Sequence, residues 1–418
     1  MKCIKSLFIT FVFVSFSFVN AHAFLSSDDI GSTTAQFLKL GIGAKSAAMG
    51  NAVTSVNNGT DAIYWNPANL IYIDKKELSF SHAIWFEDVN YEWLSFALPT
   101  TEYGVFGFGL QYVSYGSIDK VDNTNTSDGS FSPLDMALYL SYANSYDRLN
   151  FGLNLKYIYS KIEESASAIA LDLGATYKLY NDKTFIGAAL TNLGTSMKFN
   201  KESEELPLLF KIGASHYLLD EWLVSLDLNF PKDNEFYFNF GTQYSIEIAD
   251  DLNFALRVGY EGRNKDIPGF NWINLGFGFE YLDYKFDYAF VPYGDIGMTH
   301  RFSFGIKFGK KVDKIDLAEQ ERRAQQETNV PSQKKQAAQE QQQVIPEAKE
   351  TDKPAEKVDA QQQSQVKTEV KDQNKQQEQK MQVQTEVKEQ NKQPQQKMSV
   401  AAKKKQNVQN IKTQAGNK

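Results

Sequence analysis

The chain has 418 residues, 13% of them aromatic and 23% charged, with a formal net charge of −7. The charge is unevenly divided, because residues 24–308 carry 20 basic and 35 acidic side chains, whereas residues 309–418 carry 22 basic and 16 acidic ones. An acidic body of this size excludes nucleic acid as its partner, and the single cysteine, Cys3, leaves the rest of the chain without disulfides or thiolate metal sites.

Residues 1–23 have the pattern of a secretory signal peptide. Lys2 and Lys5 form a basic start, an uncharged apolar run follows at 7–19, and a small-x-small cleavage site ends at Ala23. The apolar run is too short for a stable membrane span, although an uncleaved N-terminal anchor is the alternative interpretation. We therefore expect export of the chain and cleavage after Ala23.

Residues 24–75 lack the alternation of a strand, and the stretch 31–70 is rich in Gly and Ala. Small side chains permit close contact between backbones, Asn-Pro marks a turn, and an aromatic pair beside that turn can anchor it. The sequence thus predicts an N-terminal plug segment. Its candidate motif is Tyr64, Trp65, Asn66, Pro67 and Ala68.

Residues 76–308 alternate apolar and polar side chains with period two, as in the run LNFGLNLKY at 149–157. A soluble all-β sandwich gives the same alternation, with its apolar face inward. Two features favour a membrane barrel: the polar face is rich in Gly, Asn and Ser, and the strands have about ten residues, enough to cross a bilayer at a tilt. The fold class is therefore all-β, a 14-stranded antiparallel transmembrane β-barrel. The predicted strands are 76–86, 90–98, 103–115, 134–145, 149–161, 167–180, 183–192, 206–217, 221–230, 235–246, 251–261, 272–282, 284–291 and 299–308.

The connections between these strands predict an orientation. Every second connection is short, whereas the others include the long loops 116–133, 193–205, 262–271 and 292–298. Barrels in the outer membrane have short periplasmic turns and long external loops. We therefore expect a barrel surrounded by outer-membrane lipid, with both termini in the periplasm.

The tryptophans of the predicted barrel avoid the middle of the strands. Trp85, Trp93 and Trp272 fall at the long-loop ends, and Trp222 falls at a short-turn end. Aromatic girdles occupy these levels of a membrane protein. We therefore expect all four side chains to face the membrane interface.

The last strands carry charged side chains on the face predicted to point away from lipid. A charge on the lipid side would cost about 2–4 kcal/mol at the midplane of the bilayer, so the lumen is the expected location. These side chains either neutralise one another and brace the barrel or the plug, or they line a surface that contacts cargo. They are Arg257, Glu280, Lys285, Asp287, Arg301 and Lys307.

The final predicted strand alternates strictly and ends in Phe. Such a strand resembles the signal that barrel-assembly machinery recognises, although that signal usually lies at the end of a chain. The residues that would carry it are Phe302, Phe304, Ile306 and Phe308.

The tail, residues 309–418, contains no Phe, Trp or Tyr and is dominated by Gln, Lys, Glu and Ala. A segment of this composition cannot bury enough apolar surface to offset the entropy of ordering it. We expect a disordered periplasmic tail whose removal spares the barrel, with a short helix as the exception at 312–327.

The sequence carries no recognisable catalytic or metal site. His82, His216 and His300 lie on three separate predicted strands, and no spacing of His, Cys or acidic residues suits zinc or calcium. We predict that the chain is not an enzyme and has no cofactor.

The plug segment resembles the opening of the PorV/PorQ family, which is related to the FadL-type transporters. The chain departs from the family pattern at Lys45, Asn51 and Asn69, where Arg, Gly and Gly are usual. The matching features are Phe37-Leu38, Gly41-x-Gly43-Ala44, Ala48-Met49-Gly50, Asp61-Ala62 and Tyr64-Trp65-Asn66-Pro67-Ala68.

This resemblance implies a fourteen-stranded barrel with its N-terminus folded into the lumen. FadL-like members pass hydrophobic small molecules, whereas PorV-like members hold secreted cargo proteins for type IX secretion, and fold alone does not choose between them. A structural outer-membrane protein whose basic tail binds the cell wall or a periplasmic partner is the alternative.

Overall fold

The computed structural model describes residues 31–86, 89–121, 127–179, 181–199 and 202–323. The expected signal peptide and the tail beyond Arg323 lie outside the described residues. Within the described ranges, no helix is long and apolar enough to cross a membrane.

The described chain consists of short helices, a set of long strands and two small hairpins. The helices are η3 (Gln36–Lys39), α2 (Ala44–Ala48), η4 (Gly59–Asp61), α3 (Ala62–Trp65), η5 (Pro67–Tyr72), η6 (Gly262–Asn264) and η7 (Gly294–Ile296). The long strands are β1 (Lys76–Ile84), β2 (Asn90–Pro99), β3 (Val105–Ser114), β6 (Leu134–Tyr146), β7 (Leu149–Lys161), β8 (Ser165–Lys178), β9 (Thr184–Gly194), β12 (Leu209–Leu219), β13 (Trp222–Pro231), β14 (Tyr237–Ala249), β15 (Leu252–Glu261), β16 (Asn274–Tyr281), β17 (Tyr284–Pro292) and β18 (Met298–Phe308). The hairpins are β4 (Ile118–Val121) with β5 (Ser127–Phe131), and β10 (Met197–Phe199) with β11 (Glu202–Glu204).

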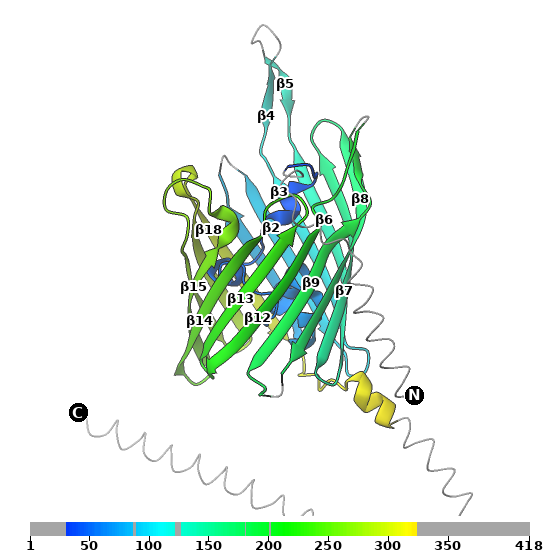
Figure 1. The fold of residues 1–418 in the computed structure, drawn as a ribbon, viewed down its shortest axis with the longest axis vertical. Coiled ribbons are helices and arrows are strands. Elements are labelled where there is room, and N and C mark those ends of the chain that lie inside the picture. The colour runs from blue at the N-terminus through cyan, green and yellow to red at the C-terminus, as the bar shows by residue number, and fades with distance from the viewer. Residues whose placement is uncertain (1–30, 87–88, 122–126, 180, 200–201, 324–418) are drawn as a thin grey trace, which may run out of the picture. The chain divides into compact units, whose positions relative to one another are not determined.

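The fourteen long strands of the described chain form one closed antiparallel barrel (Figure 1). β1 pairs with β18 along its whole length, from Lys76 opposite Phe308 to Ile84 opposite His300. The sheet therefore closes on itself, as a sheet in hydrocarbon must. The prediction of a 14-stranded antiparallel barrel is confirmed.

The alternation of the strands sorts side chains between the two faces of the barrel. On β7, Leu153, Leu155 and Tyr157 are exposed on the outside, whereas Asn154 and Lys156 are buried inside. An apolar outer face of this kind would be unfavourable in contact with water, whereas in a bilayer it contacts the hydrocarbon chains of the lipid. On β18, Phe302, Phe304 and Phe308 face outward in the same way, and Ile306 is partly buried.

Two of the predicted tryptophan positions are wrong. Trp93 is 1% exposed and points into the lumen, where its ring packs 5.4 Å from that of Tyr139. Trp85 lies among the rings of Phe86 and Tyr293 rather than in lipid. The aromatic neighbours inside the barrel offer these rings more contact than the membrane interface does. Trp222 and Trp272 are exposed, with exposed fractions of 40% and 52%.

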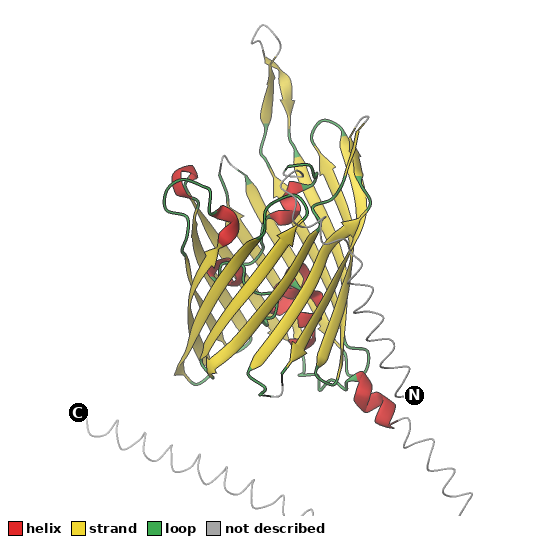
Figure 2. Cartoon of the chain, in the orientation of Figure 1, coloured by secondary structure: helices red, strands yellow, loops and turns green. Residues whose placement is uncertain are grey.

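Residues 31–75 lie inside the barrel, where their short helices fill the middle of the lumen (Figure 2). We call this segment the plug. Its small residues Ala44, Ala48 and Ala52 are fully buried. Larger side chains at these places would hold the plug backbone away from the wall.

The chain continues in contact with the barrel after β18. We call residues 310–323 the strap, which lies against the short-turn end. The Val312 amide donates to the carbonyl of Asp74 at 2.8 Å, the Lys314 ammonium donates to the carbonyl of Ile73 at 2.6 Å, and the Ile315 amide donates to that of Thr101 at 2.8 Å. Residues 317–323 are helical, within the stretch where a helix was expected.

The strap refines the prediction that the tail is dispensable. Stopping the chain after Arg323 should leave the stability of the barrel unchanged, because the strap is retained. Stopping it after Lys311 removes the strap and should lower the free energy of unfolding by about 2 kcal/mol, since each hydrogen bond contributes about 0.5–1.5 kcal/mol. Thermal unfolding of both truncated proteins in one detergent checks this, and equal midpoints would show that the strap adds nothing.

Candidate functional site

Glycines on the inner face of the wall let the plug backbone touch the strands. A Cβ atom on Gly259 would collide with the backbone of Met49 and Gly50, and one on Gly152 would collide with the backbone of Pro67 and Ala68. Such contacts tolerate no side chain at the wall position. Gly187 and Gly241 meet the plug backbone in the same way, whereas Gly174 and Gly276 lie closest to the side chains of Asn66 and Ala48.

Polar side chains of the wall hold the plug through its backbone carbonyls. A buried carbonyl without a partner is strongly unfavourable, and these donors help to satisfy the carbonyls of the plug. The donors and the residues whose carbonyls accept are Gln111 to Phe37, Arg263 to Lys39, Tyr91 to Leu40, Arg301 to Gly41, Asn274 to Ala47, Ser215 to Ser55, Asn154 to Ile63 and Lys211 to Trp65.

The predicted plug motif forms the turn between α3 and η5. The side-chain oxygen of Asn66 accepts from the amide of Ala68 at 3.2 Å and so caps η5, whose first residue is Pro67. The indole of Trp65 donates to the carbonyl of Ile42, and the hydroxyl of Tyr64 donates to that of Leu38. The motif thus connects the two ends of the plug.

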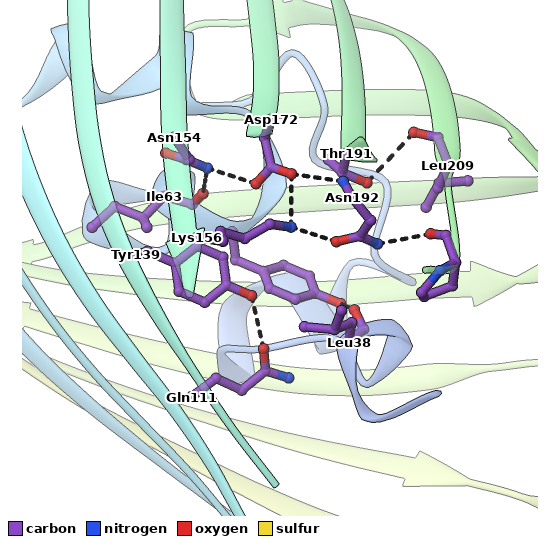
Figure 3. A network of polar contacts seen from close by, with 12 residues as sticks. Leu38, Ile63, Gln111, Tyr139, Asn154, Lys156, Asp172, Thr191, Asn192 and Leu209 are labelled. Atoms are coloured by element: carbon purple, nitrogen blue, oxygen red, sulfur yellow. Dashed lines mark hydrogen bonds and ion pairs between the residues drawn. The ribbon is translucent and has the colours of Figure 1, made fainter. Parts of the chain in front are cut away.

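A buried polar network joins β7, β8 and β9 next to the plug (Figure 3). The Lys156 ammonium lies 2.7 Å from a carboxylate oxygen of Asp172, and both side chains are almost fully buried. Asn154 donates to the other oxygen of Asp172 at 2.8 Å, and the amide of Asn192 donates to the first at 2.8 Å. Asn192 has a φ of 66°, and the register of β8 and β9 shifts beside it, so the network satisfies an irregular part of the wall.

The predicted lumen charges all belong to the inner face, and most of them meet on β15–β18. The Arg257 guanidinium lies 2.6 Å from Asp287, and the Lys307 ammonium lies 2.6 Å from Glu280. Lys285 pairs with Glu77 at 3.4 Å. These pairs link one strand to another, and none of them involves the plug.

Arg301 lies apart from this group. Its guanidinium donates to the carbonyl of Gly41 and to the hydroxyl of Tyr293, and it lies 5.1 Å from the centre of the Trp85 ring. It contacts the plug directly, unlike the other predicted charges.

The paired charges line a cavity of about 220 Å³ between the plug and β14–β18, which we call the charged cavity. Three of its charged residues were missed by the sequence analysis. Glu77 alternates with the outward-facing Leu78, which could have placed it inside, whereas Lys45 and Asp61 belong to the plug, where no periodicity reports orientation.

The two plug charges of this cavity have altered acidities. Burial, with the positive charge of Arg257 as the next cause, lowers the pKa of Lys45 to about 8. Burial raises the pKa of Asp61 to about 7, with the negative charges of Asp287 and Glu77 adding to the effect. Both environments therefore disfavour the charged form.

A second, smaller cavity of about 40 Å³ lies between the plug and the long-loop half of the wall. We call it the aromatic cavity. Tyr64, Trp65, Tyr139 and Tyr237 contribute rings to its lining, and Lys211 approaches the Trp65 ring at 5.0 Å. The plug separates this cavity from the charged one.

A closed antiparallel barrel with an apolar outer face and a polar inner face is a transmembrane β-barrel, and this one is filled by its own N-terminal segment. Neither the comparison with protein-family models nor that with curated proteins finds a match.

Solved structures similar to this chain include several channels. The Pseudomonas putida toluene transporter TodX has 16% identity, with 63% of this chain and 96% of that chain covered and a TM-score of 0.44. The CymD monoaromatic hydrocarbon channel has 14% identity, covering 65% and 98%, with a TM-score of 0.45. A FadL homologue of Pseudomonas aeruginosa has 12% identity, covering 62% and 96%, with a TM-score of 0.39. The resemblance to the PorV/PorQ family stays a prediction.

Proposed function

We propose that this protein is an outer-membrane channel that passes small molecules when its plug shifts within the lumen. The observation that carries the proposal is the way in which the plug is held. Hydrogen bonds to its backbone carbonyls, the bonds from Thr54 to Asp227 and an ion pair of Lys39 with Asp233 hold it, while the ion pairs of the charged cavity connect wall to wall. The plug can therefore move without breaking an ion pair between strands.

The aromatic cavity supports a hydrophobic solute, as the FadL-like resemblance also does. Rings of Tyr64, Trp65 and Tyr139 give an apolar surface beside polar and charged side chains, and an uncharged aromatic molecule can stack on rings and accept cations over its face. A solute seated there would lie directly against the plug and would need the plug to move before it could pass.

Fixing the plug to the wall should abolish uptake. The hydroxyls of Thr60 on the plug and Ser95 on β2 are 2.8 Å apart and fully buried, so we expect the two thiols of the double variant Thr60→Cys/Ser95→Cys to form a disulfide on oxidation. We expect the oxidised variant to lose uptake of a small labelled aromatic hydrocarbon by cells that produce the protein. Reduction should restore the uptake.

The matched control joins two wall strands. Ser81 on β1 and Ser303 on β18 have hydroxyls 2.7 Å apart, so Ser81→Cys/Ser303→Cys places a disulfide between two wall strands. The hydrogen bond that Ser303 accepts from the Ala44 amide of the plug is lost in the oxidised and reduced forms alike. Uptake by this variant should be equal in its oxidised and reduced forms. Undiminished uptake by the oxidised plug variant would refute the proposal that the plug moves.

The cargo-holding function of PorV-like proteins is a second candidate, and the β4–β5 hairpin favours it. This hairpin extends beyond the rim of the barrel at the long-loop end (Figure 1), where a protein partner can reach it. Replacing residues 118–131 by a short Gly-Ser loop should then abolish retention of cargo at the cell surface while the barrel assembles normally. Binding of a partner by the tail stays a prediction, testable by capture with residues 309–418 as bait.

A further inference from the structure

Two charged side chains of the plug lack a partner of opposite charge. The Lys45 ammonium donates to the carbonyl of Asn57 at 2.7 Å, and no described carboxylate pairs with it. Asp61 is 6% exposed, and its Oδ1 atom has no hydrogen-bond partner among the described residues. An isolated buried charge is unfavourable, so the buried Asp61 lacks a cation, and the half-buried Lys45 on the same cavity lacks an anion.

The wall of the charged cavity cannot supply these counter-charges. Its acidic residues already pair with its basic residues across the strands, as described above. Moving a wall side chain toward the plug would leave its own partner unpaired and buried, with no net gain.

The charged cavity has room for a ligand and an opening to solvent. Its volume of about 220 Å³ far exceeds the ~10–15 Å³ that one water needs. The Glu280 side chain on its lining is 40% exposed and that of Lys307 is 24% exposed, so the cavity reaches solvent at the short-turn end. Lys45 and Asp61 both line the same space.

We infer that the charged cavity binds a small zwitterion, with the ammonium of the ligand against Asp61 and its carboxylate against Lys45. A lone cation would leave Lys45 unpaired, and a lone anion would leave Asp61 unpaired. A zwitterion satisfies both and keeps the cavity neutral, as its balanced wall requires. Binding from the short-turn end needs no movement of the plug, so this site does not depend on the proposed channel function.

Binding should pass through a maximum with pH. Below about pH 7 Asp61 takes up a proton, and above about pH 8 Lys45 loses one, so each change removes one half of the site. The other charged groups that face the cavity are Glu77 on β1, Arg257 on β15, Glu280 on β16, Lys285 and Asp287 on β17, and Lys307 on β18.

Isothermal titration of the purified full chain in detergent, between pH 7 and 8, tests the inference. The probes are glycine, β-alanine and γ-aminobutyrate, which differ in the separation of their charges, with butyrate and n-butylammonium as singly charged controls. At least one zwitterion should bind about tenfold more tightly than either control. Asp61→Asn and Lys45→Met should each weaken that binding about tenfold or more.

Matched variants of the exposed pair Lys265 and Glu235, Lys265→Met and Glu235→Gln, should bind like the unmodified protein. Disulfide formation between cysteines at positions 60 and 95, introduced into each variant, reports whether the plug stays docked. If a variant loses its plug, the comparison of probes on the unmodified protein decides the matter. Equal binding of the controls, no binding of any zwitterion at saturating concentration, or full binding by docked Asp61→Asn protein would each overturn the inference.

Discussion

Replacing Gly259 by alanine is expected to expel the plug and raise the conductance of the barrel about tenfold or more. The added methyl group would overlap the backbone of Met49 and Gly50, which cannot rotate out of the way as a side chain could. Overpacking of this kind typically costs about 1–3 kcal/mol, and about 1.4 kcal/mol suffices for a tenfold shift between docked and undocked plug. Single-channel recording in planar bilayers measures the change.

The control for this prediction is the same substitution at another glycine of the inner wall. A Cβ atom on Gly305 would lie 3.6 Å from its nearest neighbours, in ordinary contact. Gly305→Ala should therefore conduct like the unmodified protein. If the Gly259→Ala variant conducts no better than the unmodified protein, the wall and not the plug has shifted to make room for the methyl group. The proposal that the plug blocks the lumen would then lose its main support.

Replacing Lys156 by methionine should destabilise the barrel by about 3–5 kcal/mol, the usual loss when one partner of a buried ion pair is removed. Asp172 would keep its bonds from Asn154 and from the amide of Asn192, yet its charge would have no counter-charge in a nearly water-free site. Unfolding by guanidinium in lipid vesicles measures this effect. The double variant Lys156→Met/Asp172→Asn should recover most of the lost stability, because it removes the stranded charge and keeps an acceptor for the amide of Asn192.

An exposed ion pair at the end of β8 gives the control. Lys178 and Asp182 lie 3.1 Å apart at the end of β8, with exposed fractions of 40% and 60%. Lys178→Met should change stability by less than about 0.5 kcal/mol. Similar losses at both sites would show that burial does not determine the strength of these pairs.

The strands were predictable because lipid and lumen impose opposite demands on alternate residues. A one-residue error in register would place Asn154 and Lys156 in hydrocarbon, so the pattern at 149–157 admits one arrangement. The loops 116–133 and 193–205 face no such demand, and the hairpins that form within them were not foreseen.

The site was harder to predict because its contacts join distant parts of the chain. The six lumen charges face inward, as expected of strands in lipid, yet their partners follow from strand order and register, which bring Glu77 on β1 to Lys285 on β17. Trp93 lies near the end of its strand, as girdle residues do, but its side chain is on the inner face of the barrel. Its position along the strand was therefore not enough to predict its surroundings. The orientation of the plug has no periodic signal at all.

Many of the hydrogen bonds that hold the plug reach its main chain, and a second set reaches side chains such as Thr54, Asn66 and Asn69. A carbonyl is the same at every residue, so Gln111, Asn154 and Arg301 would bind many different plug sequences equally well. Selection for docking therefore acts on the hydrogen-bonding groups of the wall, and at many plug positions it acts mainly on side-chain volume. In a saturation mutagenesis experiment the wall donors should tolerate almost no change, whereas plug positions whose side chains make no hydrogen bond to the wall should accept polar or apolar substitutes of equal volume. Plugs could then be exchanged between diverged barrels of this type, with the specificity inherited from the wall.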